Sequence, residues 1–221
     1  MVQISIDDNF RNSCPAFKGA GLHAKFTNSA FSEGLWKEIS LVTENCRKVF
    51  TAESIKDIPA ISSTRSAYRT LGKDPSRYRP SGESLMRRIL QGKPLYQINT
   101  AVDLINLASI EYGYSIGGFD LSKIRGEKVA LGVGEAGEPY EGIGRGTLNI
   151  ENLPVYRDEN GGIGTPTSDN ERTKLSLDTT ELLALVNGYD GDDANIRRCA
   201  ERIEELLYKY ANCTYCRIFT Y

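Results

Sequence analysis

Residues 160–173, NGGIGTPTSDNERT, combine residue types that can hold a reacting ligand. Three glycines without side chains allow backbone N–H groups to approach a ligand closely: Gly161, Gly162 and Gly164. Thr167, Ser168 and Asp169 follow with two hydroxyls and a carboxylate at adjacent positions. The alternative is a long hairpin turn in which Ser168 and Asp169 bond to their own backbone. Both interpretations stay open on composition alone.

A second glycine pattern, GxGxxG, follows the apolar run KVAL at Gly132, Gly134 and Gly137. In dinucleotide-binding proteins this pattern opens a helix whose N-terminus meets the pyrophosphate. Here EPYEGIG follows, and its proline and glycines favour another turn and strand. The pattern therefore predicts a hairpin loop, and we expect no cofactor.

His23 is the only histidine of the chain and lies in AGLHAKF, whose alternation is typical of a strand. One histidine cannot build a multi-histidine metal site, and no Ser/His/Asp or Cys/His set surrounds it. We therefore predict a structural imidazole. An enzyme with this sequence would use backbone donors, carboxylates or groups of its substrate.

The five cysteines are an odd number, and the opening MVQISIDDNF has neither the basic nor the apolar region of a secretion signal. We expect reduced thiols, a cytoplasmic location and no membrane association. Cys213 and Cys216 form a CxxC without a second ligand pair, so we expect no metal site.

Charge is unevenly distributed along the chain. The formal net charge is −2, but residues 64–93 hold eight basic and two acidic residues, a local charge of +6. Arg77 and Arg79 lie in the loop of this segment and are candidates for contacts with RNA phosphates. The alternatives are a solvated face of two helices, or an Arg79 that pairs with Glu83.

Apolar periodicity predicts helices at residues 29–50, 63–71, 81–90, 100–112 and 196–210. The first contains Phe31, the second ends at Gly72, and Ser81 is expected to cap the third, with Glu83 in its first turn. In the fourth helix one face carries apolar and polar side chains together: Val102, Ile105, Asn106 and Ser109.

Beyond residue 127 the runs KVALGV, LPVYR, KLSLD and ELLALV predict strands, and TYCRIFTY predicts a last strand. Segregated helices and strands indicate an α+β fold with helices packed on a mostly antiparallel or mixed sheet. We expect a single domain over 1–221 with a core near 64–188. An N-terminal strand and helix and a C-terminal helix and strand elaborate that core.

Two segments resemble a known family: AVDLINLASIEYGYSIGGFDLSKIRGEKVALGVGEAGE and LPVYRDENGGIGTPTSD. They are similar, in order, to the B3/B4 domain of the phenylalanyl-tRNA synthetase beta subunit. With GKDPSRYRPSGESLMRRI, the chain resembles stand-alone B3/B4 proteins. The resemblance implies tRNA binding and an editing site that hydrolyses the ester of a wrong amino acid on tRNA. The aminoacylation motifs are not present.

The resemblance also implies site residues. Asn106 keeps one member of the family's Thr-Asn pair, while Gly117 stands where the family has histidine. Phe119 and Asp120 match the family's Phe-Asp. The glycine-rich loop falls on 162–165. The family's Ser-Glu falls on Ser168 and Asp169, and its tyrosine-reading glutamate falls near Thr179 or Thr180.

The leading prediction is a trans-acting deacylase for mischarged aminoacyl-tRNA. Gly162 and Gly164 would stabilise the oxyanion, Asn106 and Ser109 would fix the aminoacyl group or water, and Asp169 would orient an ammonium or hydroxyl. Further expected substrate contacts are Gly117, Thr167, Ser168, Thr179 and Thr180. Arg77 and Arg79 would contact the tRNA acceptor end. The alternatives are a binding module for an amino acid or RNA end, and an interaction protein that kept only the fold.

Overall fold

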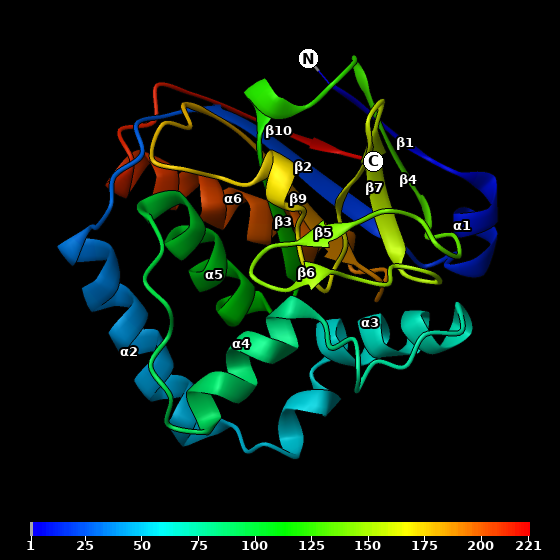
Figure 1. Cartoon of the computed structure of the whole chain (residues 1–221). Coiled ribbons are helices and arrows are strands. Elements are labelled where there is room, and N and C mark those ends of the chain that lie inside the picture. The colour runs from blue at the N-terminus through cyan, green and yellow to red at the C-terminus, as the bar shows by residue number, and fades with distance from the viewer. Residues whose placement is uncertain (1) are drawn as a thin grey trace.

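The computed structural model describes residues 2–221 and shows the α+β fold that the sequence predicts (Figure 1). The helices are α1 (Asp8–Ser13), α2 (Glu33–Val49), α3 (Pro59–Thr70), α4 (Ser81–Leu90), α5 (Thr100–Tyr112) and α6 (Asp193–Tyr210). The strands are β1 (Gln3–Ile6), β2 (Lys18–Lys25), β3 (Ser115–Asp120), β4 (Lys128–Val133), β5 (Glu141–Gly142), β6 (Gly146–Thr147), β7 (Pro154–Asp158), β8 (Gly161–Gly164), β9 (Glu181–Gly188) and β10 (Tyr215–Thr220).

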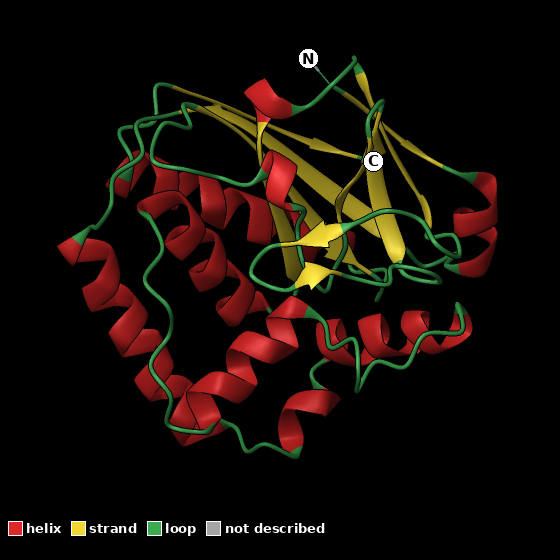
Figure 2. Ribbon diagram, viewed as in Figure 1, coloured by secondary structure: helices red, strands yellow, loops and turns green. Residues whose placement is uncertain are grey.

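Two four-stranded sheets form the centre of the molecule. The first has the order β10-β2-β9-β3 and is antiparallel, while the second, β1-β4-β7-β8, is mixed because β1 runs parallel to β4. Figure 2 shows the strands above and the helices mostly below and beside them. Helices α2, α5 and α6 cover one face of the first sheet, and the second sheet packs on its other face.

Strand β9 shows why ELLALV is apolar throughout. Leu182 and Ala184 point into the core shared with the helices, while Leu183 and Leu185 point into the core between the sheets. Because successive side chains of a strand face opposite sides, a strand buried on both faces has no polar alternation. The predicted strand is confirmed.

Helix α5 has the predicted bounds and lies at the centre of the helical layer. The Asn99 side chain accepts a hydrogen bond from the Val102 N–H at 3.0 Å, which caps the N-terminus. Gly113 ends the helix with a φ of 78°, in the left-handed region that glycine adopts without strain. These two ends place the Asn106 side chain beside β3.

Two predicted helix starts are wrong, and the third helix begins at Ser81 as predicted but has a different cap residue. The first helix begins at Glu33 with Ser32 as its cap, so Phe31 lies outside it and is 50% exposed. The second begins at Pro59, because proline suits the first helical turn. At the third, Pro80 holds the N-cap position, and the Ser81 N–H donates to the Pro166 carbonyl at 2.7 Å.

The predicted strand KLSLD is also wrong. Residues 175–180 form a turn in which Thr179 Oγ1 accepts a hydrogen bond from the Ser176 N–H at 2.9 Å, and Leu177 is exposed. The alternation of this segment comes from one buried and one exposed leucine in a loop.

The GxGxxG segment ends β4 and continues into a loop that holds the β5–β6 hairpin before β7 pairs antiparallel with β4. Within residues 2–221 the glycines open no helix, and strands follow them, as predicted from the sequence. Across residues 2–221, no helix is both long enough and apolar enough to cross a bilayer.

Candidate functional site

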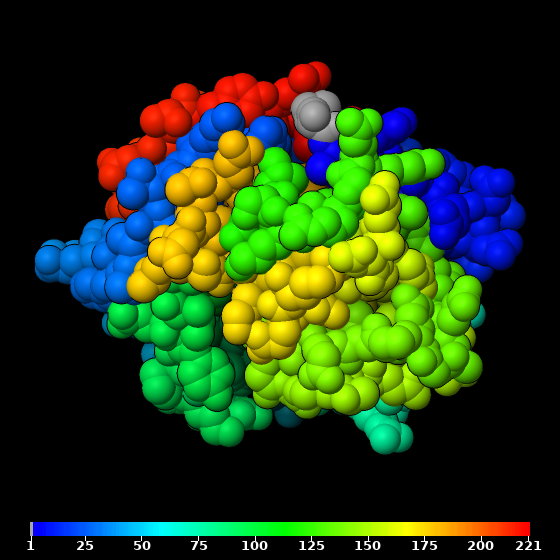
Figure 3. Space-filling model, turned by 45° about the horizontal axis from the view of Figure 1, so that its top comes forward, coloured from blue at the N-terminus to red at the C-terminus, as the bar shows by residue number. Residues whose placement is uncertain are grey.

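Two adjoining cavities lie where α5, β3 and the segment after β8 meet. The larger has a volume of about 320 Å³ and the smaller about 120 Å³. Four residues line both: Ile105, Asn106, Ile116 and Asp169. We name the two cavities together the Asn106–Asp169 pocket. In Figure 3 the green part of the chain faces the yellow and yellow-green parts across a recess at this place.

Asp169 is the titratable group of the pocket. It forms an isolated bridge with Gly164, and its Oδ2 accepts a hydrogen bond from the Gly118 N–H at 3.0 Å. Its side chain keeps only a partly exposed edge. Burial raises its pKa to about 7, against the opposing effect of the Gly118 N–H. A carboxyl with this pKa can accept or release a proton near neutral pH.

Asn106 is the free polar group of the pocket. Its side chain lines both cavities and makes no side-chain hydrogen bond to any residue between 2 and 221. A partly exposed amide of this kind can donate to and accept from a ligand. The structure thus brings Asn106 and Asp169 together from positions 63 residues apart.

Ser109 and Ser168 line the smaller cavity, but their surroundings engage them within the fold. Ser109 Oγ donates to the Tyr114 carbonyl at 2.5 Å. The Ser168 carbonyl accepts from Tyr140 Oη at 2.7 Å and from Thr165 Oγ1 at 3.0 Å. The loop that contains Ser168 therefore bonds to its own backbone and also lies beside the pocket, so both alternatives from the sequence hold in part.

The other predicted ligand contacts lie away from the pocket. Thr167 Oγ1 is 2.8 Å from Tyr68 Oη and donates to the Tyr78 carbonyl, so it faces α3. Thr179 is buried and donates to Asp120 Oδ2 at 2.8 Å, and Thr180 is exposed. The hydroxyls of Thr167 and Thr179 are therefore used within the fold.

The glycines of β8 also differ from the prediction. Gly162 and Gly164 pair with β7 and line neither cavity, so the geometry does not place their N–H groups as oxyanion donors there. A Cβ on Gly162 would lie 2.8 Å from the Tyr140 ring. A Cβ on Gly164 would lie 2.5 Å from the Phe119 ring and 3.1 Å from Asp169 Oδ1. Close packing is what requires glycine here.

Gly117 has the same neighbours as Gly164. Its Cβ would lie 2.6 Å from the Phe119 ring and 3.3 Å from Asp169 Oδ1. The ring of Phe119, fully buried, therefore occupies the space that two side chains would need. A side chain at either glycine would therefore also crowd the Asp169 carboxyl.

The packing role of Gly164 leads to a prediction. The variant Gly164→Ala should lower the free energy of unfolding by about 1–3 kcal/mol, because the buried Phe119 ring must move. Urea denaturation of the purified variant measures this change. Gly142→Ala is the matched control, since its Cβ meets nothing closer than 3.3 Å. Equal midpoints for the two variants would contradict the packing role.

Sequence reasoning missed several residues that line the larger cavity. Ile98 and Ile143 are exposed apolar side chains at its edge, and Lys174 and Leu175 follow β8. The indication in the sequence was a single isoleucine within each of two polar loops, YQIN and EGIG. Such residues mark binding surfaces only when the fold gathers them.

His23 and the cysteines lie outside the pocket. His23 Nε2 is 3.2 Å from Glu181 Oε2, and its ring packs against Tyr215 at 5.4 Å. Burial raises the pKa of Cys14 to about 11, which keeps this thiol protonated. Within residues 2–221 no group of His, Cys, Asp and Glu side chains is suited to hold a metal ion.

The basic segment is partly structural. Lys73 is buried and donates to the carbonyls of Asn149 and Glu151 at 2.9 and 2.6 Å. Arg77 is exposed, whereas Arg79 Nε lies 3.6 Å from Glu83 Oε1. Pairing of Arg79 with Glu83, the alternative noted from the sequence, is therefore present. Contacts of Arg77 and Arg79 with RNA stay a prediction.

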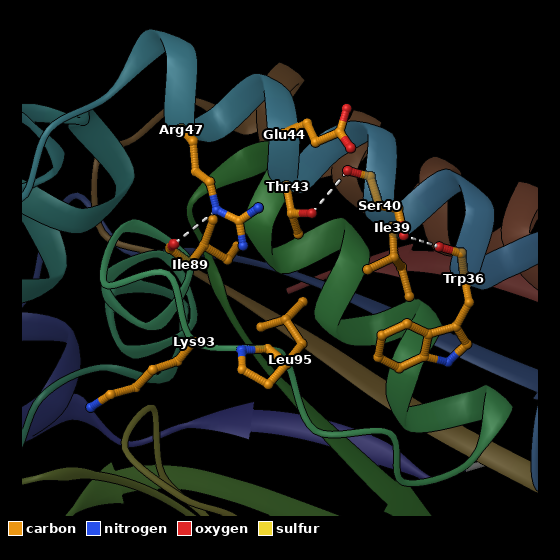
Figure 4. Close-up of a pocket in the computed structure, with 10 residues that line it drawn as sticks. Trp36, Ile39, Ser40, Thr43, Glu44, Arg47, Ile89, Lys93 and Leu95 are labelled. Carbon is orange, nitrogen blue, oxygen red and sulfur yellow. Dashed lines mark hydrogen bonds between the residues drawn. The ribbon is translucent and has the colours of Figure 1, made fainter.

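Another cavity, of about 220 Å³, lies between α2 and the segment after α4 (Figure 4). Several of its polar groups are bonded within the fold: Arg47 Nε donates to the Ile89 carbonyl at 3.1 Å, and Ser40 Oγ to the Trp36 carbonyl at 2.8 Å. None of the predicted site residues lines it. The Asn106–Asp169 pocket is therefore the candidate site.

Comparison with known proteins identifies the family of the chain. No curated protein matches the chain. A solved N-terminal fragment of the phenylalanyl-tRNA synthetase beta subunit from Pyrococcus horikoshii is 14% identical, with a TM-score of 0.49. The likeness covers 98% of this chain and 50% of that one, so the chain spans half its length. The B3/4 domain profile matches residues 63–211, from α3 to the end of α6. The chain therefore belongs to the B3/4 domain family.

Proposed function

We propose that this protein hydrolyses the ester of a mischarged aminoacyl-tRNA in the Asn106–Asp169 pocket. Membership of the B3/4 family supports a tRNA-related role. The observation that carries the finer proposal is the Asp169 carboxyl, with a pKa of about 7, in a cavity that it shares with the free Asn106 amide. A pocket of about 320 Å³ is large enough for an aminoacyl group.

The proposed reaction needs no covalent intermediate. The Asp169 carboxylate accepts a proton from a water molecule, whose oxygen bonds to the ester carbonyl carbon. The bond between that carbon and the ribose oxygen then breaks, and the ribose oxygen takes the proton from Asp169. The products are a free amino acid and a tRNA with its terminal hydroxyl restored.

The Asn106 side chain stabilises the oxyanion, the role that the sequence suggested for the β8 glycines. Its amide NH₂ donates to the carbonyl oxygen as negative charge develops on it. This assignment follows from position, since Asn106 lines both cavities whereas Gly162 and Gly164 line neither. Loss of one such donor typically slows an enzyme by about 10²–10³-fold.

The walls of the pocket indicate the kind of amino acid that fits. Apolar side chains predominate around the larger cavity: Ile98, Val102, Ile105, Ile116, Ile143 and Leu175. Thr179 and Thr180, where the resemblance places a reader of the tyrosine hydroxyl, lie outside. We therefore propose an ester of an amino acid with an apolar side chain as substrate.

The test is a panel of tRNAs, each charged with a radiolabelled noncognate amino acid and incubated with the purified chain. At least one ester, with an apolar side chain, should lose its label at least about tenfold faster than in buffer. The variant His23→Gln is the control and should keep this rate, because His23 pairs with Glu181 outside the pocket. Binding of a free amino acid without cleavage of any ester would instead favour the binding module.

A further inference from the structure

A further cavity, of about 290 Å³, lies along the exposed side of α4. Arg79, Arg87, Arg88 and Lys93 line it together with Tyr96, and none of its lining residues is acidic. We name it the basic groove. Lys93 also lines the cavity of Figure 4, where its side chain extends away from Trp36.

The basic groove lies next to the Asn106–Asp169 pocket along two walls. On the first wall, Leu85 of α4 lines both the groove and the smaller cavity of the pocket. On the second wall, Tyr96 lines the groove and Ile98 lines the larger cavity. Two residues of chain span at most about 7 Å, so an extended ligand in the groove would have its end close to the pocket.

Positive charge in the groove exceeds what the fold neutralises. Glu83 is fully buried behind it and is shared by Arg65, Arg79 and Arg87. Two of these arginines, Arg79 and Arg87, line the groove and share this one carboxylate, while Arg88 and Lys93 form no salt bridge within residues 2–221. Arg79 Nε is buried and has no hydrogen-bond partner among residues 2–221. An anionic ligand matches this surplus.

Tyr96 adds a flat surface between these cations. It is 65% exposed, and the Arg88 guanidinium lies 3.8 Å from its ring centroid. Arg88 Nε in turn donates to the Pro94 carbonyl at 2.6 Å, which holds this pair in place. An exposed aromatic ring among cations is the arrangement on which bases of single-stranded nucleic acid stack.

We infer that the basic groove binds the single-stranded 3′ end of an RNA. Its phosphates contact Arg88 and Lys93, and one base stacks on Tyr96. The terminal ribose then enters the Asn106–Asp169 pocket, and this last step rests on the proposed function. The stacking surface favours RNA over an acidic peptide, which would use the cations alone.

The test measures RNA binding without any ester. The probe is a fluorescein-labelled RNA stem-loop that has a four-nucleotide single-stranded 3′ end and no amino acid, and the readout is fluorescence anisotropy. Tyr96→Ala should weaken binding about tenfold, whereas Tyr96→Phe should bind as the unchanged chain does. Lys93→Gln should reduce the slope of log K against log salt by about 0.7–0.9.

Matched controls lie away from the groove. Tyr208→Ala removes a tyrosine of similar exposure on α6, and Lys128→Gln removes an exposed lysine on β4. Neither should change the affinity. A stem-loop with a blunt end should bind more weakly and be insensitive to Tyr96→Ala.

Three results would overturn the inference: an unchanged affinity of Tyr96→Ala, equal binding of the blunt stem-loop, or equal competition by polyglutamate. Because the probe carries no ester, these results are independent of hydrolysis. A chain that binds the probe through Tyr96 but cleaves no ester keeps this inference and loses the proposed function. A chain that cleaves an ester but binds the probe equally well after Tyr96→Ala keeps the proposed function and loses this inference.

Discussion

Replacement of Asp169 by Asn is expected to slow ester hydrolysis at least about 100-fold, equivalent to about 2.7 kcal/mol of transition-state stabilisation. Asn has nearly the same shape and keeps an oxygen that can accept from the Gly118 N–H. It cannot accept a proton from water. The measurement is the first-order loss of ester with the best substrate of the panel, at saturating protein.

The pH dependence gives a second readout of the same carboxyl. Asp169 has a pKa of about 7, so the unchanged chain should gain activity as pH rises through 7, where the carboxylate forms. The residual activity of Asp169→Asn should lack this step. RNA binding to the basic groove should be the same for both, because Asp169 does not line the groove.

The stability of the unchanged chain should fall over the pH range in which its activity rises. A folded-state pKa raised from 3.8 to about 7 means that the folded chain binds this proton more tightly than the unfolded chain does. The contribution of Asp169 to stability is therefore fully present below about pH 4 and lost as pH rises through 7. Relative to the unchanged chain, Asp169→Asn should gain up to about 4 kcal/mol between these values.

The control for both readouts is Asp178→Asn, which alters an exposed aspartate in the turn before β9. It should leave the rate and the pH profile unchanged. Full activity of a folded Asp169→Asn protein would exclude general-base catalysis by this carboxyl. An activity step that persists in the variant would assign the pH dependence to another group.

Replacement of Glu83 by Gln should cause the largest loss of stability, about 3–5 kcal/mol. The Glu83 side chain is fully buried, with Arg65 Nη1 at 2.9 Å and Arg87 Nε at 2.7 Å. Without its charge, these guanidinium groups and that of Arg79 face one another with no neutralising partner. Urea denaturation at constant salt measures the loss.

Glu33→Gln is the matched control for this experiment. Glu33 forms an exposed pair with Lys37 on α2 at 2.8 Å, and such pairs contribute less than about 1 kcal/mol. A change at Glu83 no larger than that at Glu33 would show that the arginines need no carboxylate. The sequence suggested for Glu83 a favourable position near the start of α4 and a pairing with Arg79, but not its burial among three arginines.

Local patterns predicted most elements of the fold. The apolar period placed α5 at its observed bounds, and the alternation of AGLHAKF and the apolar run ELLALV identified β2 and β9. These patterns work because a helix or strand must turn its apolar side chains toward a core. The motif resemblance likewise predicted the B3/4 family.

Ends of elements were less predictable. Ser81 looks like a helix cap, but Pro80 takes that position because the Ser81 N–H bonds to Pro166, 85 residues away along the chain. KLSLD has the alternation of a strand, yet Thr179 closes it into a turn. In both cases a hydrogen bond outside the pattern decided the local structure.

The sequence by itself determined most of the helices and strands. It also indicated that Arg79 could pair with Glu83, and it identified Asn106 and Asp169 as candidate site residues. Only the tertiary structure decided that these two share a pocket, that Glu83 is buried, and that Gly164 makes room for Phe119. The physical reason is the separation along the chain of the residues that interact. Periodicity reflects contacts within a few residues, whereas the pKa of Asp169 depends on protein from distant elements that removes water from its carboxyl.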